Sequence, residues 1–149
     1  MTVPVTTPVI AADIIAALDL APHPEGGWYR QTWAAPAAPG QRPGGSAIYF
    51  LLRAAEVSHW HRFDAAEIWH HHTGAALTLR MAATAQGPVQ TVLLGPDIAR
   101  GMVPQAVVPQ GWWQSARSAG EWTLVGCTTT PAFQFDGFEL APPGFDIPD

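Results

Sequence analysis

The sequence has few basic residues, one cysteine and no long apolar run, and each shortage excludes a class of protein. Its seven basic residues are all arginine, they are scattered along the chain, and the formal net charge is −5. Because nucleic-acid binding depends on clustered basic residues, we expect no nucleic-acid partner. Cys127 stands alone, so it can form neither an internal disulfide nor a multi-cysteine zinc site. We expect it to be an inert buried thiol.

No stretch approaches the roughly 18 consecutive apolar residues that a membrane-spanning helix needs. The N-terminus also lacks a basic segment followed by an apolar one. We therefore expect a cytoplasmic protein with no membrane partner. The chain is instead rich in core-forming residues, since 48% of its 149 residues are hydrophobic and seven are tryptophan. This composition argues against disorder and predicts a single domain over residues 1–149 with a sizeable core.

One segment near the N-terminus has a helical period, which predicts a helix over about residues 8–19. Thr7 suits the N-cap and Pro8 the first helical position, where its missing N–H costs nothing. The helix should end before Pro22, because proline disfavours helical conformation in the residue before it. The apolar face of this helix consists of Ile10, Ile14, Ile15 and Leu18.

Beyond this helix, glycine and proline recur every eight to twelve residues or so, which is the spacing of short strands. Ten such strands predict an all-β sandwich or closed barrel. We expect residues 36–45 to form a mobile loop and residues 142–149 to lie across the surface or fray. The predicted strands are residues 29–34, 46–53, 56–61, 66–72, 76–83, 89–94, 106–108, 112–117, 121–127 and 132–140.

The most informative stretch is residues 58–74, which contains five of the six histidines. His59 and His61 are two residues apart, so on an extended strand both imidazoles leave the same face. Together with the carboxylate of Glu67, two imidazoles inside a small β domain indicate a metal site or an acid–base site. A carboxylate buried in a barrel would be costly without a partner, which favours a role in the site for Glu67.

Strand alternation extends this prediction to the neighbours of Glu67. Trp69 and His71 should share its face, whereas His70 and His72 should lie on the opposite face. We expect the latter two to face a second sheet or a dimer partner.

The order His-x-His, five residues, Glu, six residues, Gly resembles the first signature of the cupin superfamily. Residues 109–114, Pro-Gln-Gly-Trp-Trp-Gln, resemble the second signature, with Gln114 where histidine is usual. The chain resembles more closely the small single-domain bacterial and fungal cupins whose biochemical role is unassigned. That resemblance covers roughly residues 8–140 in six segments: 22–30, 46–52, 61–70, 108–116, 124–128 and 138–140.

This resemblance implies a cupin double-stranded β-helix, which is a jelly-roll barrel, with a short N-terminal helix and usually a homodimer. It brings no known reaction with it. Some cupin sugar isomerases bind zinc through Gln, two His and Glu, which here correspond to Gln114, His59, His61 and Glu67. One divalent ion (Zn, Ni, Mn or Fe) is therefore possible at these four residues, as is a metal-free site. Two departures weaken the metal reading: the longer spacing before Glu67, and the neutral amide of Gln114, a weaker ligand than imidazole.

We expect the barrel to bind a small polar molecule, a sugar-like or carbonyl compound, and to act as an isomerase or epimerase. Two alternatives stay open: a metal-dependent oxygenase, and a ligand-binding or sensing module without chemistry. The predicted catalytic residues are His61, Glu67 and Tyr49. The predicted ligand-binding residues are Arg62, Trp69, His71, Trp113 and Gln114. For Arg62, a salt bridge is the competing interpretation.

Overall fold

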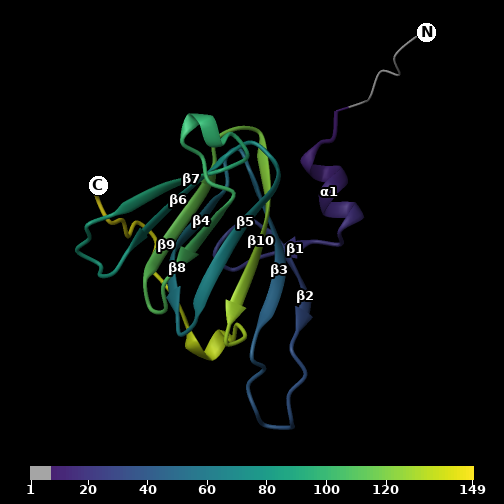
Figure 1. Ribbon diagram of the computed structural model, residues 1–149, viewed down its shortest axis with the longest axis vertical. Helices are drawn as coiled ribbons and strands as arrows, with labels where there is room; N and C mark the ends of the chain where they lie inside the picture. The colour runs from purple at the N-terminus through teal and green to yellow at the C-terminus, as the bar shows by residue number, and fades with distance from the viewer. Residues whose placement is uncertain (1–7) are drawn as a thin grey trace.

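Two antiparallel sheets face each other and enclose an apolar interior (Figure 1). The structure is a computed structural model, and it describes residues 8–149. The first sheet has the order β1 (Ala21–Pro22), β2 (Trp28–Ala34), β3 (Ser46–Arg53), β10 (Trp122–Thr130), β5 (Ala66–Gly74), β8 (Gln105–Val108). The second has the order β11 (Phe138–Leu140), β4 (Val57–Phe63), β9 (Trp113–Ser118), β6 (Leu77–Ala82), β7 (Gln90–Leu94). The all-β class predicted from the sequence is therefore confirmed.

The main core lies between the inner faces of the two sheets. Alternate residues of each strand point inward, so the side chains from both sheets meet in one layer. Full burial of a large apolar side chain contributes about 1.5–3 kcal/mol, which makes this layer the main source of stability. Its largest members are Phe50, Leu52, Trp69, Leu77, Leu79 and Leu94.

The N-terminal helix is shorter than predicted and does not begin at Pro8. It spans α1 (Ala11–Ala17), and Ile10 is the N-cap residue. The backbone N–H of Ile10 donates to the Asp13 carboxylate at 3.4 Å, so the acidic side chain performs the capping. Thr7, the predicted N-cap, lies outside the described residues. Asp19 follows the helix with a φ of 53°, and the chain has left the helix before Pro22.

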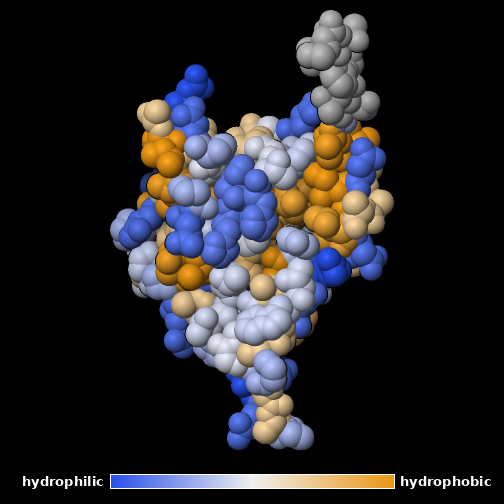
Figure 2. Space-filling view, turned by 45° about the vertical axis from the view of Figure 1, so that its right-hand side comes forward, coloured by the Kyte–Doolittle hydropathy of each residue, from blue (hydrophilic) through white to orange (hydrophobic). Residues whose placement is uncertain are grey.

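The helix covers part of the outer face of the first sheet, beside β3 and β10 (Figure 1). Ile14 packs there with Leu51 and Leu124, and apolar residues gather on the surface around the helix (Figure 2). No helix within residues 8–149 is long and apolar enough to cross a membrane.

Most predicted strands are present, but the predicted strand 132–140 forms only at its end, as β11. The backbone before it is engaged elsewhere: Ala132 N–H donates to the Pro43 carbonyl, and Phe133 N–H donates to the Ser46 hydroxyl. A short 3₁₀ turn, η2 (Phe135–Gly137), then leads into β11. A second such turn, η1 (Ile98–Arg100), joins β7 to β8, and neither it nor β1 was predicted.

The C-terminal residues 142–149 lie across the outer face of the second sheet and are held there. Ile147 is fully buried, and its carbonyl accepts a hydrogen bond from Arg80 at 2.7 Å. Trp60 Nε1 donates to Asp146 Oδ1 at 2.9 Å. Of the two outcomes expected for this segment, the structure therefore shows the surface-bound one.

Strand β4 contains one extra residue, and this irregularity determines which side chains reach the interior. Ser58 pairs with Ala116 and His61 pairs with Gln114, so His59 and Trp60 together lie opposite Ser115. Such a bulge reverses the inward and outward alternation of the strand. Ser58 and His61 are buried, and Trp60 is buried instead under the C-terminal residues on the outer face.

Candidate active site

A cavity of about 330 Å³ opens between the two sheets. Its polar lining includes the buried side chains of His23, Glu25, His61 and Glu67, together with Asp19, Arg30, Gln31, Ser46 and Thr129. Its aromatic wall is formed by Tyr29, Phe63, Phe133 and Phe135. Cavities that combine apolar walls with a few convergent polar groups are the usual form of small-molecule sites.

The first polar feature is a buried pair between Glu25 and His61. Glu25 Oε2 lies 3.0 Å from His61 Nε2, and the two side chains are 8% and 2% exposed. His61 Nδ1 lies 2.8 Å from the carbonyl oxygen of His59, to which only a protonated nitrogen can donate. Both ring nitrogens of His61 therefore carry hydrogen bonds to protein groups.

The two pKa shifts of this pair favour its ionised form. Burial alone would raise the pKa of Glu25, but the charge and hydrogen bond of His61 lower it below its ordinary value. Burial alone would likewise lower the pKa of His61, but the charge and hydrogen bond of Glu25 raise it. The result is a carboxylate and an imidazolium that neutralise each other inside the barrel.

The second polar feature is Glu67, on the inner face of β5. Burial, and then the charge of Glu25, raise the pKa of Glu67 to about 7. The charge of His61 and hydrogen bonds from Gln114 and Trp69 oppose this rise without cancelling it. Glu67 forms no ion pair with any described residue, and its carboxyl group changes protonation state near neutral pH.

Gln114 and Trp69 lie next to Glu67 in the interior. Trp69 Nε1 donates to Gln114 Oε1 at 2.8 Å, and both side chains are almost fully buried. Gln114 lies directly opposite His61 in the second sheet. The amide and the indole are therefore held together next to the Glu67 carboxyl group.

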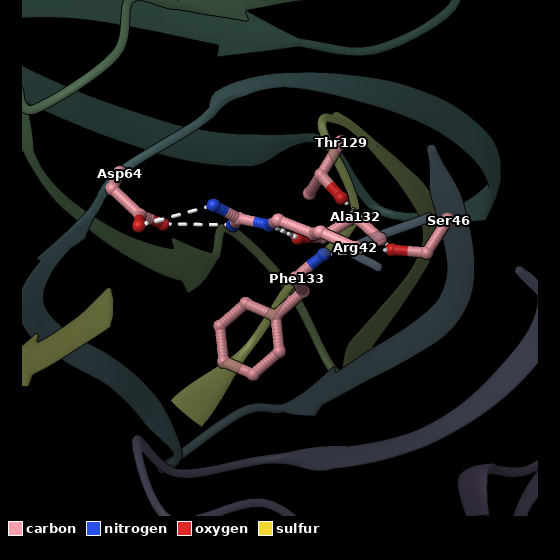
Figure 3. Close-up of polar contacts among 6 residues, drawn as sticks. All are labelled: Arg42, Ser46, Asp64, Thr129, Ala132 and Phe133. Carbon is pink, nitrogen blue, oxygen red and sulfur yellow. Dashed lines mark hydrogen bonds and ion pairs between the residues drawn. The ribbon is translucent and has the colours of Figure 1, made fainter. Parts of the chain in front are cut away.

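The roof of the cavity is the segment of residues 131–137, which carries Phe133 and Phe135. A brace holds it: Arg42 Nε donates to the Ala132 carbonyl at 2.8 Å, and its two terminal nitrogens reach Asp64 at 2.8 and 3.1 Å (Figure 3). Two-point arginine–carboxylate contacts fix orientation as well as distance. Ser46 adds a second tie, since its hydroxyl lies 2.8 Å from Thr129 Oγ1 and accepts the Phe133 N–H (Figure 3).

The structure brings together His61, Glu67, Gln114 and Trp69, but it separates His59 from them. The prediction that His59 and His61 share a face is wrong, because the bulge in β4 turns His59 outward. His59 Nε2 lies 3.0 Å from the Pro142 carbonyl, and the residue lines a hollow on the outer face of the second sheet.

Four other predicted site residues also lie away from the cavity: Tyr49, Arg62, His71 and Trp113. Trp113 packs with Trp60 and Ile147 on the outer face of the second sheet. Tyr49 is on the outer face of β3, where it packs near α1. The centroid of its ring lies 6.2 Å from the centroid of the His72 ring. Arg62 pairs with Glu139 at 2.8 Å and lies over the Trp113 ring, so the salt-bridge interpretation of Arg62 is the one the structure supports. His71 Nε2 lies 3.1 Å from the Ala75 carbonyl at the far end of β5.

His70 and His72 lie on the outer face of the first sheet and therefore do not face the second sheet. His70 Nε2 lies 3.1 Å from Thr128 Oγ1 of the neighbouring strand. A dimer partner on this face stays a prediction. Cys127, in contrast, lines the cavity as a buried free thiol, and burial raises its pKa well above the ordinary value.

The predicted metal-binding set does not fit a divalent ion. His59 is outside the cavity, both nitrogens of His61 are hydrogen-bonded, and Gln114 Oε1 accepts from Trp69. Within residues 8–149, no three His, Cys, Asp or Glu side chains converge as metal ligands. Glu67 is then the one remaining ligand of the four, and one ligand does not make a site.

Sequence reasoning missed two cavity residues, His23 and Glu25. Both belong to the segment 22–30, which carries the family resemblance, and its Pro-Glu-Gly-Gly sequence is typical of a turn. Gly26 has a φ of 106°, and a Cβ there would collide with the Val57 carbonyl. This close approach to β4 is the signal, because only glycine allows Glu25 to be placed against a buried strand.

Comparison with known proteins agrees with this architecture and identifies the class as the cupin fold. A match to the family described as Cupin superfamily (DUF985) covers residues 12–141, and the chain belongs to this family. A protein from Shewanella oneidensis is 42% identical, with a TM-score of 0.84, over 89% of this chain and 85% of that one. A hypothetical protein from Leishmania major is 27% identical, with a TM-score of 0.83, over 92% and 90% of the two chains.

More distant structures share the fold alone. A dTDP sugar isomerase from Desulfovibrio desulfuricans is 16% identical, with a TM-score of 0.58, over 80% of this chain and 83% of that one. No curated protein matches the sequence. The cupin jelly-roll predicted from the signatures is confirmed.

Proposed function

We propose that the protein is an acid–base enzyme of isomerase or epimerase type, in which Glu67 moves a proton on a small carbonyl compound bound in the cavity. The observation that carries this proposal is the position of Glu67, a carboxyl group without a counter-ion on the wall of a cavity of about 330 Å³. A carboxyl group that is half protonated near neutral pH can both accept and return a proton, as general acid–base catalysis requires.

The other polar groups have supporting roles. Because both nitrogens of His61 are bound to protein groups, His61 holds Glu25 in place and is not the base. The negative charge of Glu25 in turn raises the pKa of Glu67. The aromatic wall offers a flat apolar surface for the rest of the ligand, which suits sugar rings and small ketones.

Solvent exchange tests the proposal without knowledge of the substrate. The protein is incubated in D₂O with dihydroxyacetone, glyceraldehyde, aldopentoses and aldohexoses, and NMR measures deuterium uptake at the carbon beside the carbonyl. We expect uptake with at least one compound, and Glu67→Gln should slow it by about 100-fold or more. His59→Gln, outside the cavity, is the matched control and should keep the rate.

Two results would overturn the proposal. Compounds that bind in the cavity of the wild-type protein without any exchange would favour a ligand-binding module. Exchange that is lost on chelation and restored by a divalent ion would favour metal chemistry instead.

A further inference from the structure

His23 also lines the cavity, but it has no role in the reaction proposed above. Its side chain is 5% exposed, and its ring lies edge-on to Tyr29 at 4.4 Å between centroids. Its backbone is fixed as well: His23 N–H donates to the Gly27 carbonyl at 2.9 Å, and Gly26 N–H donates to the His23 carbonyl at 3.0 Å. The ring therefore has one well-defined position in the wall.

The backbone also determines which nitrogen of His23 carries the proton. The N–H of Glu25 donates to His23 Nδ1 at 3.1 Å, so Nδ1 presents a lone pair. In a neutral imidazole the proton must then be on Nε2. Burial lowers the pKa of His23, and this effect outweighs the opposing charge of Glu25, so the ring is neutral at neutral pH.

His23 Nε2 is a hydrogen-bond donor that faces open space. It has no hydrogen-bond partner within the part of the chain that the structure describes, residues 8–149. It is not sealed in the core either, because Ser58 Oγ is the one fully buried side-chain nitrogen or oxygen without a partner in this range. The space next to Nε2 is therefore the cavity that His23 lines.

We infer that His23 Nε2–H is the donor that binds the carbonyl oxygen of the ligand. The inference concerns binding, and only its consequence for catalysis rests on the proposed function. A ligand oxygen in the cavity would accept a hydrogen bond from this donor, which no described protein group accepts. The ligand class is narrowed to molecules with an acceptor oxygen at this position, which favours aldehydes and ketones.

In the proposed reaction this contact has a defined role. The Glu67 carboxylate takes a proton from the carbon beside the carbonyl, and the electrons of the broken C–H bond form a C=C bond. The electrons of the C=O π bond move to oxygen, and His23 Nε2–H stabilises the resulting negative charge. Glu67 then returns the proton to the former carbonyl carbon, while the hydroxyl proton of the neighbouring carbon moves to the former carbonyl oxygen. The product is the isomeric carbonyl compound, and no oxidant or co-reactant is needed.

Side-chain NMR of ¹⁵N-histidine-labelled full-length protein tests the inference. At pH 7, His23 should be the neutral tautomer with its proton on Nε2, and hydroxyacetone or dihydroxyacetone should shift the Nε2 resonance. Glycerol, which has the carbon skeleton of dihydroxyacetone without the carbonyl, should shift it much less. A proton on Nδ1, a charged ring, or an Nε2 resonance that no carbonyl probe shifts would each overturn the inference.

Three variants separate this inference from the proposed function. His23→Phe keeps a ring but has no donor, and should weaken binding of dihydroxyacetone about tenfold and slow any exchange about 100-fold. His23→Gln, whose amide N–H can replace Nε2–H, should restore part of both. His70→Phe, on the outer face, is the control, and unfolding curves verify that each variant folds.

Failure of the proposed function and failure of the oxygen site would give different results. A shifted Nε2 resonance without solvent exchange in the wild type would remove the proposed function and leave the oxygen site. Exchange that His23→Phe leaves unchanged would support the function and remove the oxygen site.

Discussion

The second sheet has a hollow on each side, and the two differ in chemistry although they share residue types. The inner cavity of about 330 Å³ has Glu25, His61 and Glu67 in its wall. The outer hollow of about 590 Å³ has His59, Arg80 and Asp146. The outer one is larger, yet its charges are open to water: Asp146 and Asp149, the partners of Arg80, have side chains 64% and 84% exposed. Burial, more than size or residue type, therefore distinguishes the candidate active site.

Strand β4 contributes residues to both hollows, and its bulge places His61 in the inner cavity and His59 in the outer hollow. The His61 side chain lines the inner cavity, where the buried Glu25 carboxylate favours its protonated form. The His59 ring donates a hydrogen bond to the Pro142 carbonyl on the outer face. Water screens charges on the outer face, and the interior does not. Substitutions that compare equivalent groups on the two sides should therefore have effects of very different size.

The largest effect should come from Glu25→Gln, which leaves the buried His61 imidazolium without a counter-ion. We expect a loss of about 3–5 kcal/mol in the free energy of unfolding at pH 6, measured by urea denaturation. The matched control is Glu139→Gln, which breaks the exposed pair with Arg62 and should cost about 0.5 kcal/mol. Equal losses in the two variants would contradict an ionised buried pair.

The stabilisation from this pair should also depend on pH in both directions. The pKa of Glu25 is lowered from 4.5, so its contribution is complete above pH 4.5 and is lost as the pH falls through the folded value. The pKa of His61 is raised from 6.5, so its contribution is complete below pH 6.5 and is lost as the pH rises through the folded value. The difference between wild type and Glu25→Gln should therefore be greatest between these two pH values.

A smaller effect of opposite sign is expected from Glu67→Gln. The pKa of Glu67 is raised from 4.5 to about 7, so the folded state binds more protons than the unfolded state between these values and stability falls as the pH rises. Each pH unit is worth about 1.4 kcal/mol, so Glu67 should cost about 3 kcal/mol by pH 8. Glu67→Gln should remove this part of the slope in urea titrations from pH 4 to 8. Glu139→Gln should leave the slope as in the wild type, and an unchanged slope in Glu67→Gln would show that the carboxyl group titrates normally.

The smallest effect should come from His59→Gln. Its ring donates to the Pro142 carbonyl on the outer face, and glutamine offers a similar amide donor. We expect a change within about 0.5 kcal/mol by the same denaturation assay. His61→Gln should lose several times as much, because it leaves Glu25 buried without a cation. If the two variants were equally stable, the bulge would not divide the histidines as described.

Much of the fold could be predicted from the sequence, because strand alternation and turn residues are local signals. Strand β3 has the bounds that its apolar pattern predicts, and the cupin signatures supplied the topology. The strand 132–140 was overpredicted because its first residues bind Pro43 and Ser46, contacts that no local pattern reveals. The helix start was misplaced for another reason: Asp13 caps Ile10 three residues away, a local signal that competes with the predicted start at Thr7 and Pro8.

The candidate site was predictable only in part. Alternation placed Glu67 and Trp69 inward correctly, since β5 is regular at that point. It failed for His59, because a single extra residue in β4 reverses every inward and outward assignment before it. Glu25 was missed because its side chain enters from a turn, where no period applies. The proposed base is Glu67 and not the predicted His61, because both imidazole nitrogens of His61 are hydrogen-bonded to protein groups.

The brace on the cavity roof has a consequence for the order in which the protein folds. Arg42 contacts Asp64 across 22 residues of sequence and Ala132 across 90. Contacts over such separations form only after the strands that bring them together, because closing long loops costs chain entropy before any contact repays it. The aromatic roof should therefore close last, over a barrel whose sheets have already paired. Until that step, a newly made chain exposes Glu67 and His61 to water, and only the finished fold buries them.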